Sequence, residues 1–204
     1  MNKLDEHIKI VGENLKTEDL LPPAGVTRSY YPMNQERDLE RDFGFVKEEP
    51  IDSITIVDRY LFANDHNCDA IEDFLKELAK YWVQKPKRIE LKYGPSSYDQ
   101  SSQWRNNAFQ VIQFLQGKPE FKDITFSTQV RNHNEPRGDK HDRKIFIRSK
   151  PPQLPKEEQT PRRRRPGTAK VDTIKGKTLS VELTGGLSHL MDKQQETSLY
   201  WWVK

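Results

Sequence analysis

The sequence predicts an α/β fold: a mixed sheet with two helices in β-α-β-α-β order, followed by antiparallel strands. Two observations predict it. Between residues 53 and 127, three apolar strand-like runs alternate with two segments of helical periodicity. After residue 140, three further strand-like runs follow with no helical segment between them. The alternating part needs parallel strands joined by crossover helices, whereas the last part suits antiparallel pairing.

Each element follows from its local pattern. We expect strands at 53–57, 88–92, 123–127, 144–147, 178–183 and 199–203, and helices at about 69–84 and 101–116. Asp69 and Glu72 have the spacing of an acidic capping pair at the start of the first helix. In the last strand, side-chain alternation turns either Trp201 or Trp202 away from the core, which favours a covering arm, a dimer or a partner.

Composition limits the class of protein. A chain of 204 residues fits one domain with appendages. No stretch approaches the roughly 18 consecutive apolar residues of a membrane span, and the N-terminus has no apolar signal segment. The single cysteine, Cys68, excludes an internal disulfide and a cysteine-based zinc site. We therefore expect an intracellular, cytoplasmic protein with no membrane span, no cofactor and no metal site.

The chain divides into an arm and a main domain. Residues 1–50 contain little apolar sequence and several prolines, which predicts an extended N-terminal arm that packs on the main domain or, as we favour, binds a partner. Residues 51–204 form the α/β domain. Within it, 149–177 are rich in proline and contain the run Arg162, Arg163, Arg164 and Arg165, so we expect a disordered basic insertion between two strands.

Charge is distributed unevenly along the chain. Residues 1–80 hold 10 Lys and Arg against 18 Asp and Glu, whereas residues 131–180 hold 15 against 6. Such a division predicts one acidic and one basic face, unless the two parts neutralise each other. The arginine run in a flexible loop suits contact with the phosphate backbone without base readout, although charge runs also remain solvated or contact acidic protein surfaces.

Polar residues at three strand ends form the candidate site. Because loops at strand ends of a parallel sheet converge on one crevice, they are expected to lie together. The residues are Asp58 and Arg59 after the first strand, His141 and Arg143 before the fourth, and Gly185, Gly186 and Ser188 after the fifth. Glycine pairs let backbone amides approach an anion closely. A histidine, arginines, a hydroxyl and free amides together suit a phosphate or a phosphodiester.

The segments that carry this site resemble a known family. The runs Ile54–Tyr60, His141-Asp142-Arg143 and Thr184–His189 are similar to a phospholipase D-like domain with one degenerate motif. The nearest pattern is the variant at the C-terminus of MIT-domain proteins and in bacterial defence and mobile-element loci. The resemblance spans roughly residues 50–204. It implies a phospholipase D-like fold, with the N-terminal arm and the arginine-rich insertion outside it.

The resemblance also implies roles for two residues. In the family, a histidine attacks phosphorus and a lysine holds the phosphate, so His141 would be the nucleophile and Arg143 the phosphate clamp. Arg148 stands where the family pattern has an aspartate. Catalysis would need a second histidine, which a homodimer could supply. His141 has two other interpretations: contact with a ligand, or a structural hydrogen bond to Asp58, which we favour.

Two functions remain open at this point. The first is a non-catalytic phospholipase D-like binding or assembly subunit of a bacterial nucleic-acid-related or antiviral defence complex, which contacts a protein partner and a phosphate backbone. In it, Arg59, Arg143, Ser188 and the arginine run would bind phosphate, and Asp58, Gly185 and Gly186 would support the site. The alternative is a metal-independent phosphodiesterase or nuclease that acts as a dimer through His141. A phosphoinositide-binding module is a third class, but the sequence supplies no membrane context for it.

Overall fold

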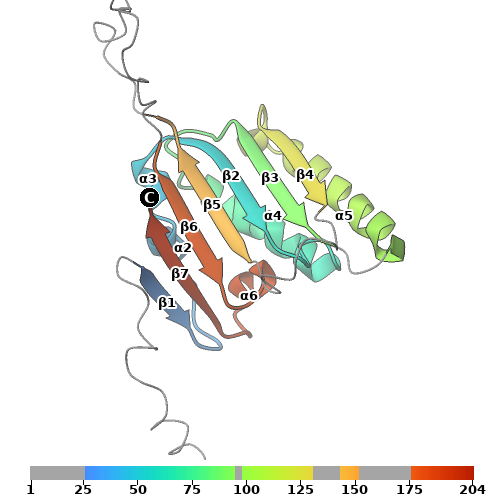
Figure 1. The fold of residues 1–204 in the computed structure, drawn as a ribbon, viewed down its shortest axis with the longest axis horizontal. Coiled ribbons are helices and arrows are strands. Elements are labelled where there is room, and N and C mark those ends of the chain that lie inside the picture. Colours follow the sequence, from blue (N-terminus) through green and yellow to red (C-terminus); the bar gives the residue numbers. More distant parts are fainter. Residues whose placement is uncertain (1–25, 95–97, 131–142, 152–175) are drawn as a thin grey trace, which may run out of the picture.

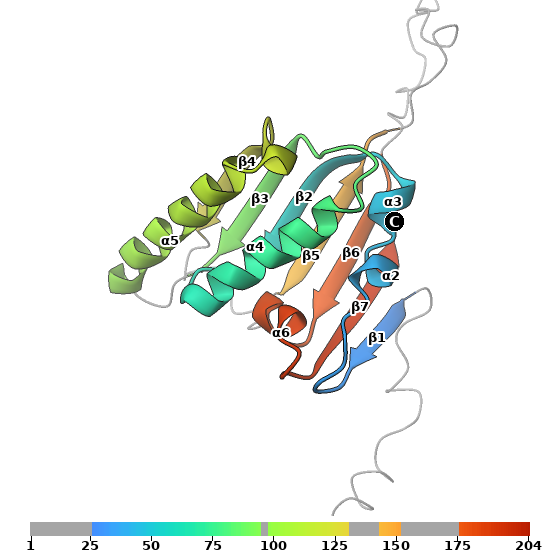
Figure 2. The ribbon, with the colours of Figure 1, turned by 180° about the vertical axis from the view of Figure 1, so that it is seen from behind.

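The computed structural model describes residues 26–94, 98–130, 143–151 and 176–204, which form one seven-stranded mixed sheet with helices on one face (Figures 1 and 2). The strands are β1 (Thr27–Tyr31), β2 (Ile51–Val57), β3 (Arg88–Tyr93), β4 (Thr125–Val130), β5 (Lys144–Ser149), β6 (Thr178–Leu183) and β7 (Thr197–Val203). The helices are α2 (Leu39–Asp42), α3 (Phe45–Glu48), α4 (Asp65–Ala79), α5 (Tyr98–Gln116) and α6 (Leu187–Met191), with the 3-10 helix η2 (Pro119–Phe121).

Strand pairing confirms the predicted fold class. The sheet order is β1-β7-β6-β5-β2-β3-β4. Strands β2, β3 and β4 are parallel and are joined through α4 and α5, as the β-α-β-α-β pattern requires. Strands β5, β6 and β7 then pair antiparallel beside β2. The α/β class, the parallel part and the antiparallel finish are therefore all present.

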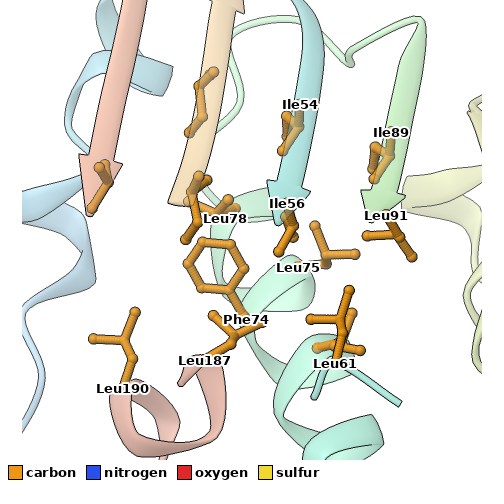
Figure 3. Close-up of a cluster of buried hydrophobic side chains, with 14 of the residues drawn as sticks. Ile54, Ile56, Leu61, Phe74, Leu75, Leu78, Ile89, Leu91, Leu187 and Leu190 are labelled. Carbon is orange, nitrogen blue, oxygen red and sulfur yellow. The ribbon is translucent and has the colours of Figure 1, made fainter. Parts of the chain in front are cut away.

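The hydrophobic core lies between the sheet and its helices. Figure 2 shows α4 and α5 crossing the same face of the sheet, with α2 and α6 on that face beside α4. Ile54, Ile56, Ile89 and Leu91 project from β2 and β3 into this layer and are almost completely buried. In Figure 3, Phe74 of α4 lies close to them, and Leu187 and Leu190 of α6 approach from below.

The ends of several elements differ from the expected ones. Helix α4 begins at Asp65, because the Asn64 side chain caps it by accepting a hydrogen bond from the Asn67 amide at 2.9 Å. The capping pair predicted at Asp69 and Glu72 was therefore wrong. The helix ends at Ala79, because the chain turns out of it to place the Val83 amide 3.2 Å from the Val46 carbonyl of α3.

Strand β4 also begins later than expected. Asp123 was predicted to start it, but its φ of 71° lies in the left-handed region, outside the β region of regular strand residues. The Ile124 amide instead donates to the Phe121 carbonyl at 3.1 Å in a turn. Extended pairing starts at Thr125, opposite Arg88 of β3.

The second half of the predicted arm belongs to the sheet and its core. Strand β1 pairs antiparallel with β7, and its Tyr31 side chain is buried. Helices α2 and α3 add Phe43 and Val46, each fully buried, to the core. Residues 27–48 therefore pack on the main domain, which was one of the two expected places, but they do so as a strand and two short helices rather than as an extended arm. The first half of the arm lies outside the described residues, and so does most of the predicted basic insertion.

The other face of the sheet is not covered by any of the described helices (Figure 1). Alternation along β7 places Trp201 on the core side, opposite Val181, and Trp202 on the uncovered side, opposite Ser180. The sequence predicted that one of this tryptophan pair would face away from the core, and the structure confirms it. Among the described helices, none is both long and apolar enough to cross a membrane.

Candidate phosphate-binding site at the strand ends

The strand ends predicted to converge do so. The last register pair of β2 and β5 is Val57 with Lys144, so the next step places Asp58 opposite Arg143. The Leu183 amide at the end of β6 donates to the Arg143 carbonyl at 2.9 Å. Three segments far apart in the sequence therefore meet at one edge of the sheet, directly before α6.

Asp58 is the centre of this cluster. Its side chain follows Ile54 and Ile56 on the core face of β2, and it is only 4% exposed. One carboxylate oxygen accepts from the Tyr60 amide at 2.9 Å, and the other accepts from the Leu187 amide at 3.0 Å. These two charge-assisted hydrogen bonds satisfy the buried carboxylate and hold α6 against the end of β2.

Gly185 and Gly186 allow α6 to approach this closely. A Cβ on Gly186 would lie 3.0 Å from the Asp58 Oδ2 atom, and one on Gly185 would lie 2.6 Å from the Cβ of His189. The second distance is shorter than real side chains tolerate, so any larger residue at Gly185 must displace His189. The glycine pair thus fits the packing of α6, and the Leu187 amide beyond it is already bonded to Asp58.

Arg143, Arg59 and Ser188 surround the buried carboxylate. Arg143 is half-buried and donates from Nη1 to the Thr184 carbonyl at 3.2 Å, which fixes its stem beside the end of β6. Arg59 is exposed, and its guanidinium carbon lies 5.6 Å from the centre of the Tyr60 ring. Ser188 is half-buried in the first turn of α6. These groups supply two guanidinium ions and one hydroxyl at a single edge of the sheet.

Several predicted site residues lie outside the described part of the chain. They are His141, Arg162, Arg163, Arg164 and Arg165. The structure therefore places Arg143 and Asp58 but gives no geometry for the predicted nucleophile or for the arginine run. In the described ranges, no three His, Cys, Asp or Glu side chains gather closely enough to hold a metal ion.

The arrangement suits the binding of an anion better than the phosphodiester cleavage that the family resemblance suggests. Both oxygens of Asp58 accept hydrogen bonds from backbone amides, so the carboxylate acts as a fixed link between β2 and α6. A guanidinium ion carries five N–H donors, of which Arg143 gives one to the Thr184 carbonyl within the described residues, so Arg59 and Arg143 suit the binding of a phosphate oxygen. The described edge of the sheet can therefore bind an anion through these two arginines.

No protein-family model matches the chain, and no curated protein is significantly similar to it in sequence.

Sequence reasoning predicted one outward-facing tryptophan but missed the group of aromatic and basic side chains to which it belongs, on the uncovered face. Aromatic and basic side chains alternate there along β1, β5 and β7, among them Tyr30, Tyr200, Trp202 and Phe146. The signal was present in the period-two alternation of each strand. It could not be combined across strands, because the order of β1, β7, β6 and β5 in the sheet was not known from sequence.

Proposed function

We propose that the protein is a non-catalytic binding subunit with a phospholipase D-like domain, which contacts the phosphate backbone of nucleic acid and a protein partner. The setting we propose is a bacterial nucleic-acid-related or antiviral defence complex. The observation that supports the proposal most strongly is the role of Asp58. The buried carboxylate in the strand-end cluster bonds two backbone amides, and the guanidinium ions of Arg59 and Arg143 lie in the same cluster.

Charge along the chain supports the nucleic-acid part of the proposal. Residues 131–180 hold 15 Lys and Arg against 6 Asp and Glu, and the arginine run lies within this segment. Binding to a phosphate backbone through such residues releases counterions, so affinity falls steeply with salt. Arg143 and Arg59 at the sheet edge would add contacts of the same kind.

The arginine run provides the first prediction. Replacing Arg162, Arg163, Arg164 and Arg165 with Glu should weaken binding to duplex and single-stranded nucleic acid alike. The slope of log affinity against log salt should become shallower by up to about 4, one unit for each lost phosphate contact. Fluorescence anisotropy with labelled oligonucleotides at several salt concentrations measures both quantities.

A matched control variant has the same change in net charge at four lysines elsewhere on the protein. Replacing Lys76, Lys80, Lys118 and Lys122 with Glu reverses four positive charges in and around the helix layer. This variant should change the slope much less. Equal slopes for the arginine variant and the wild type would contradict the proposal. So would metal-independent cleavage of DNA or RNA in EDTA that disappears in the His141→Ala variant, because that result identifies a nuclease.

A further inference from the structure

The uncovered face of the sheet has an ordered arrangement of aromatic side chains. Strand register places Phe146 of β5 and Trp202 of β7 in one row, with Ser180 of β6 between them. Tyr200 lies two residues before Trp202 on β7, and Tyr30 of β1 lies diagonally beside Tyr200. These four side chains, which we call the aromatic stripe, cross the face from its edge strand to its middle.

The aromatic stripe is accessible. Tyr30 is 51% exposed, and Tyr200, Trp202 and Phe146 are half-buried at positions whose neighbours across the strands are small or polar. Ser180 separates Phe146 from Trp202, and Ser198 lies opposite Tyr30. The serines leave Phe146, Trp202 and Tyr30 standing above the sheet surface, whereas Tyr200 lies between Arg28 and Glu182. No described helix covers these rings (Figure 1).

Positive charge surrounds the aromatic stripe. The basic residues that point to this face are Arg28, Arg88, Lys92, Lys144, Arg148 and Lys204. The acidic ones in the described residues are Glu90, Glu182 and Glu196, the last of which accepts a hydrogen bond from the Tyr30 hydroxyl at 3.1 Å, so the face has a surplus of three positive charges. The guanidinium carbon of Arg28 lies 5.8 Å from the centre of the Tyr30 ring and 5.5 Å from that of Tyr200. Lys204 lies 5.9 Å from the ring of Trp202.

Aromatic rings and positively charged side chains in this arrangement are suited to bind a single-stranded nucleic acid. Aromatic side chains stack on bases of any sequence, and interleaved arginine and lysine neutralise the backbone between them. Tyr200 and Trp202 are about 7 Å apart along β7, twice the ~3.4 Å stacking repeat of a duplex strand. Successive bases can therefore reach both rings only if the strand is extended and its bases are unstacked.

A second copy of the chain fits this face less well. An isologous dimer through it would bring the same surplus of positive charge from both protomers together, and like-charge contacts oppose association. A partner protein would have to bury the lysines of this face, Lys92, Lys144 and Lys204, whereas lysine is depleted at protein interfaces even though arginine and aromatic residues are enriched there. A polyanion with flat apolar groups satisfies both requirements at once.

We propose that the uncovered sheet face is a binding site for single-stranded nucleic acid, in which the aromatic stripe stacks on bases and Arg28, Arg148 and Lys204 contact the backbone. The site is distinct from the strand-end cluster around Asp58, and it rests on the proposed function only in requiring a nucleic-acid ligand. It adds a preference for unpaired strands, which backbone contacts by the arginine run do not supply.

The test uses labelled oligo(dT) and oligo(U) of about 16 nucleotides, the upper end of sites on such platforms, and a duplex of the same length. The wild type should bind both single strands more tightly than the duplex, and the preferred oligomer shows whether DNA or RNA is the ligand. The Tyr200→Ala/Trp202→Ala variant should lose at least about 10-fold in single-strand affinity, because two stacking contacts are removed. The matched control is Phe109→Ala, which removes a ring that is 60% exposed on α5 and should change nothing.

A second variant keeps the test decisive if the double alanine variant does not fold. Tyr200→Phe/Trp202→Phe retains two stacking rings and should bind within about threefold of the wild type. Base stacking on an indole quenches its fluorescence, so the wild type should be quenched on binding and this variant should lose most of that quenching. Unchanged quenching would place the bound strand elsewhere and overturn the proposal.

Other outcomes separate this proposal from the proposed function. If the Arg162–Arg165 charge reversal weakens binding and the alanine variant does not, the sheet-face proposal fails and the proposed function stands. If the alanine variant binds more weakly and the charge reversal does not, the sheet face is the binding site and the arginine run does not contribute to binding. Equal affinity for duplex and single strand overturns the sheet-face proposal, and so does binding of acidic polyglutamate without binding of oligonucleotide.

Discussion

Asp58 is a buried carboxylate whose hydrogen bonds identify what it does. Isolated burial of a carboxylate is costly, and two backbone amides offset that cost by donating to its two oxygens. One amide belongs to the turn after β2, and the other to α6, whose residues come about 130 positions later in the chain. The side chain therefore fixes a contact between distant segments.

Replacing Asp58 with Ala should lower the free energy of unfolding by about 2–4 kcal/mol, because the Tyr60 and Leu187 amides lose their acceptor in a buried position. Urea denaturation followed by circular dichroism measures the change. Asp73→Ala removes an exposed carboxylate on α4 and should alter stability by no more than about 0.5 kcal/mol. A loss below about 1 kcal/mol in the Asp58 variant would show that water or another group replaces the carboxylate.

At the scale of elements, β1 is held to the helix layer by one polar cluster. The Tyr31 hydroxyl donates to the buried carboxylate of Asp42 in α2 at 2.5 Å, and Ser29 donates to the same carboxylate at 2.8 Å. The Asp38 amide donates to the Tyr31 oxygen at 2.9 Å. Burial, followed by the bond to Asp42, raises the pKa of Tyr31 to about 12.

This contact predicts a loss of stability at high pH. The neutral phenol is favoured in the folded state, so its contribution is complete below pH 10 and is lost as the pH rises toward 12. The free energy of unfolding should fall by about 2 kcal/mol across that window. Tyr31→Phe should make the fall smaller, as urea denaturation at pH 9 to 12 can measure. Some decline should remain, because burial also raises the pKa of Cys68 to about 11. Parallel pH profiles for the two proteins would contradict the prediction.

Long elements could be predicted from the sequence, and short ones could not. The periodicity of Ile71, Phe74, Leu75 and Leu78 identifies α4, since each of these side chains reaches the core from one helix face. The five residues of α6 have too few turns for such a pattern, and the helix is fixed by Asp58, which is remote in sequence. Strand β1 likewise depends on β7 for its pairing.

The candidate site was likewise predictable from the sequence only in part. Sequence placed Asp58, Arg143 and the glycine pair at strand ends, and the parallel sheet brings them to one edge. It did not indicate that Asp58 bonds the Leu187 amide, because that depends on how closely α6 approaches β2. A hydrogen bond from a backbone amide to a side chain produces no periodic pattern in the sequence. The amides after the glycine pair were therefore expected to be free for an anion, whereas the Leu187 amide bonds Asp58.

At the scale of the whole molecule, the sheet separates two environments. Its covered face packs the apolar core against α4 and α5, and its uncovered face presents rings and positive charge. The strand-end cluster lies at the edge where these faces meet. Alternation in the sequence predicted that Trp201 or Trp202 faces away from the core. It did not predict which other rings lie beside that tryptophan, because strand order, a property of the complete sheet, decides which rings are neighbours.

The pairing of β1 with β7 has a consequence for how the chain folds during synthesis. Thr27 lies opposite Trp201, and β7 is the only strand that pairs with β1 in the described sheet. Loop closure over such a separation is slow, and the ribosome delivers β7 last among these strands. Until then β1 has no hydrogen-bonding partner and the outer edge of β6 stays open to other chains. The nascent protein is therefore most exposed to misassembly just before residue 197 emerges, and a chaperone would be most useful at that moment.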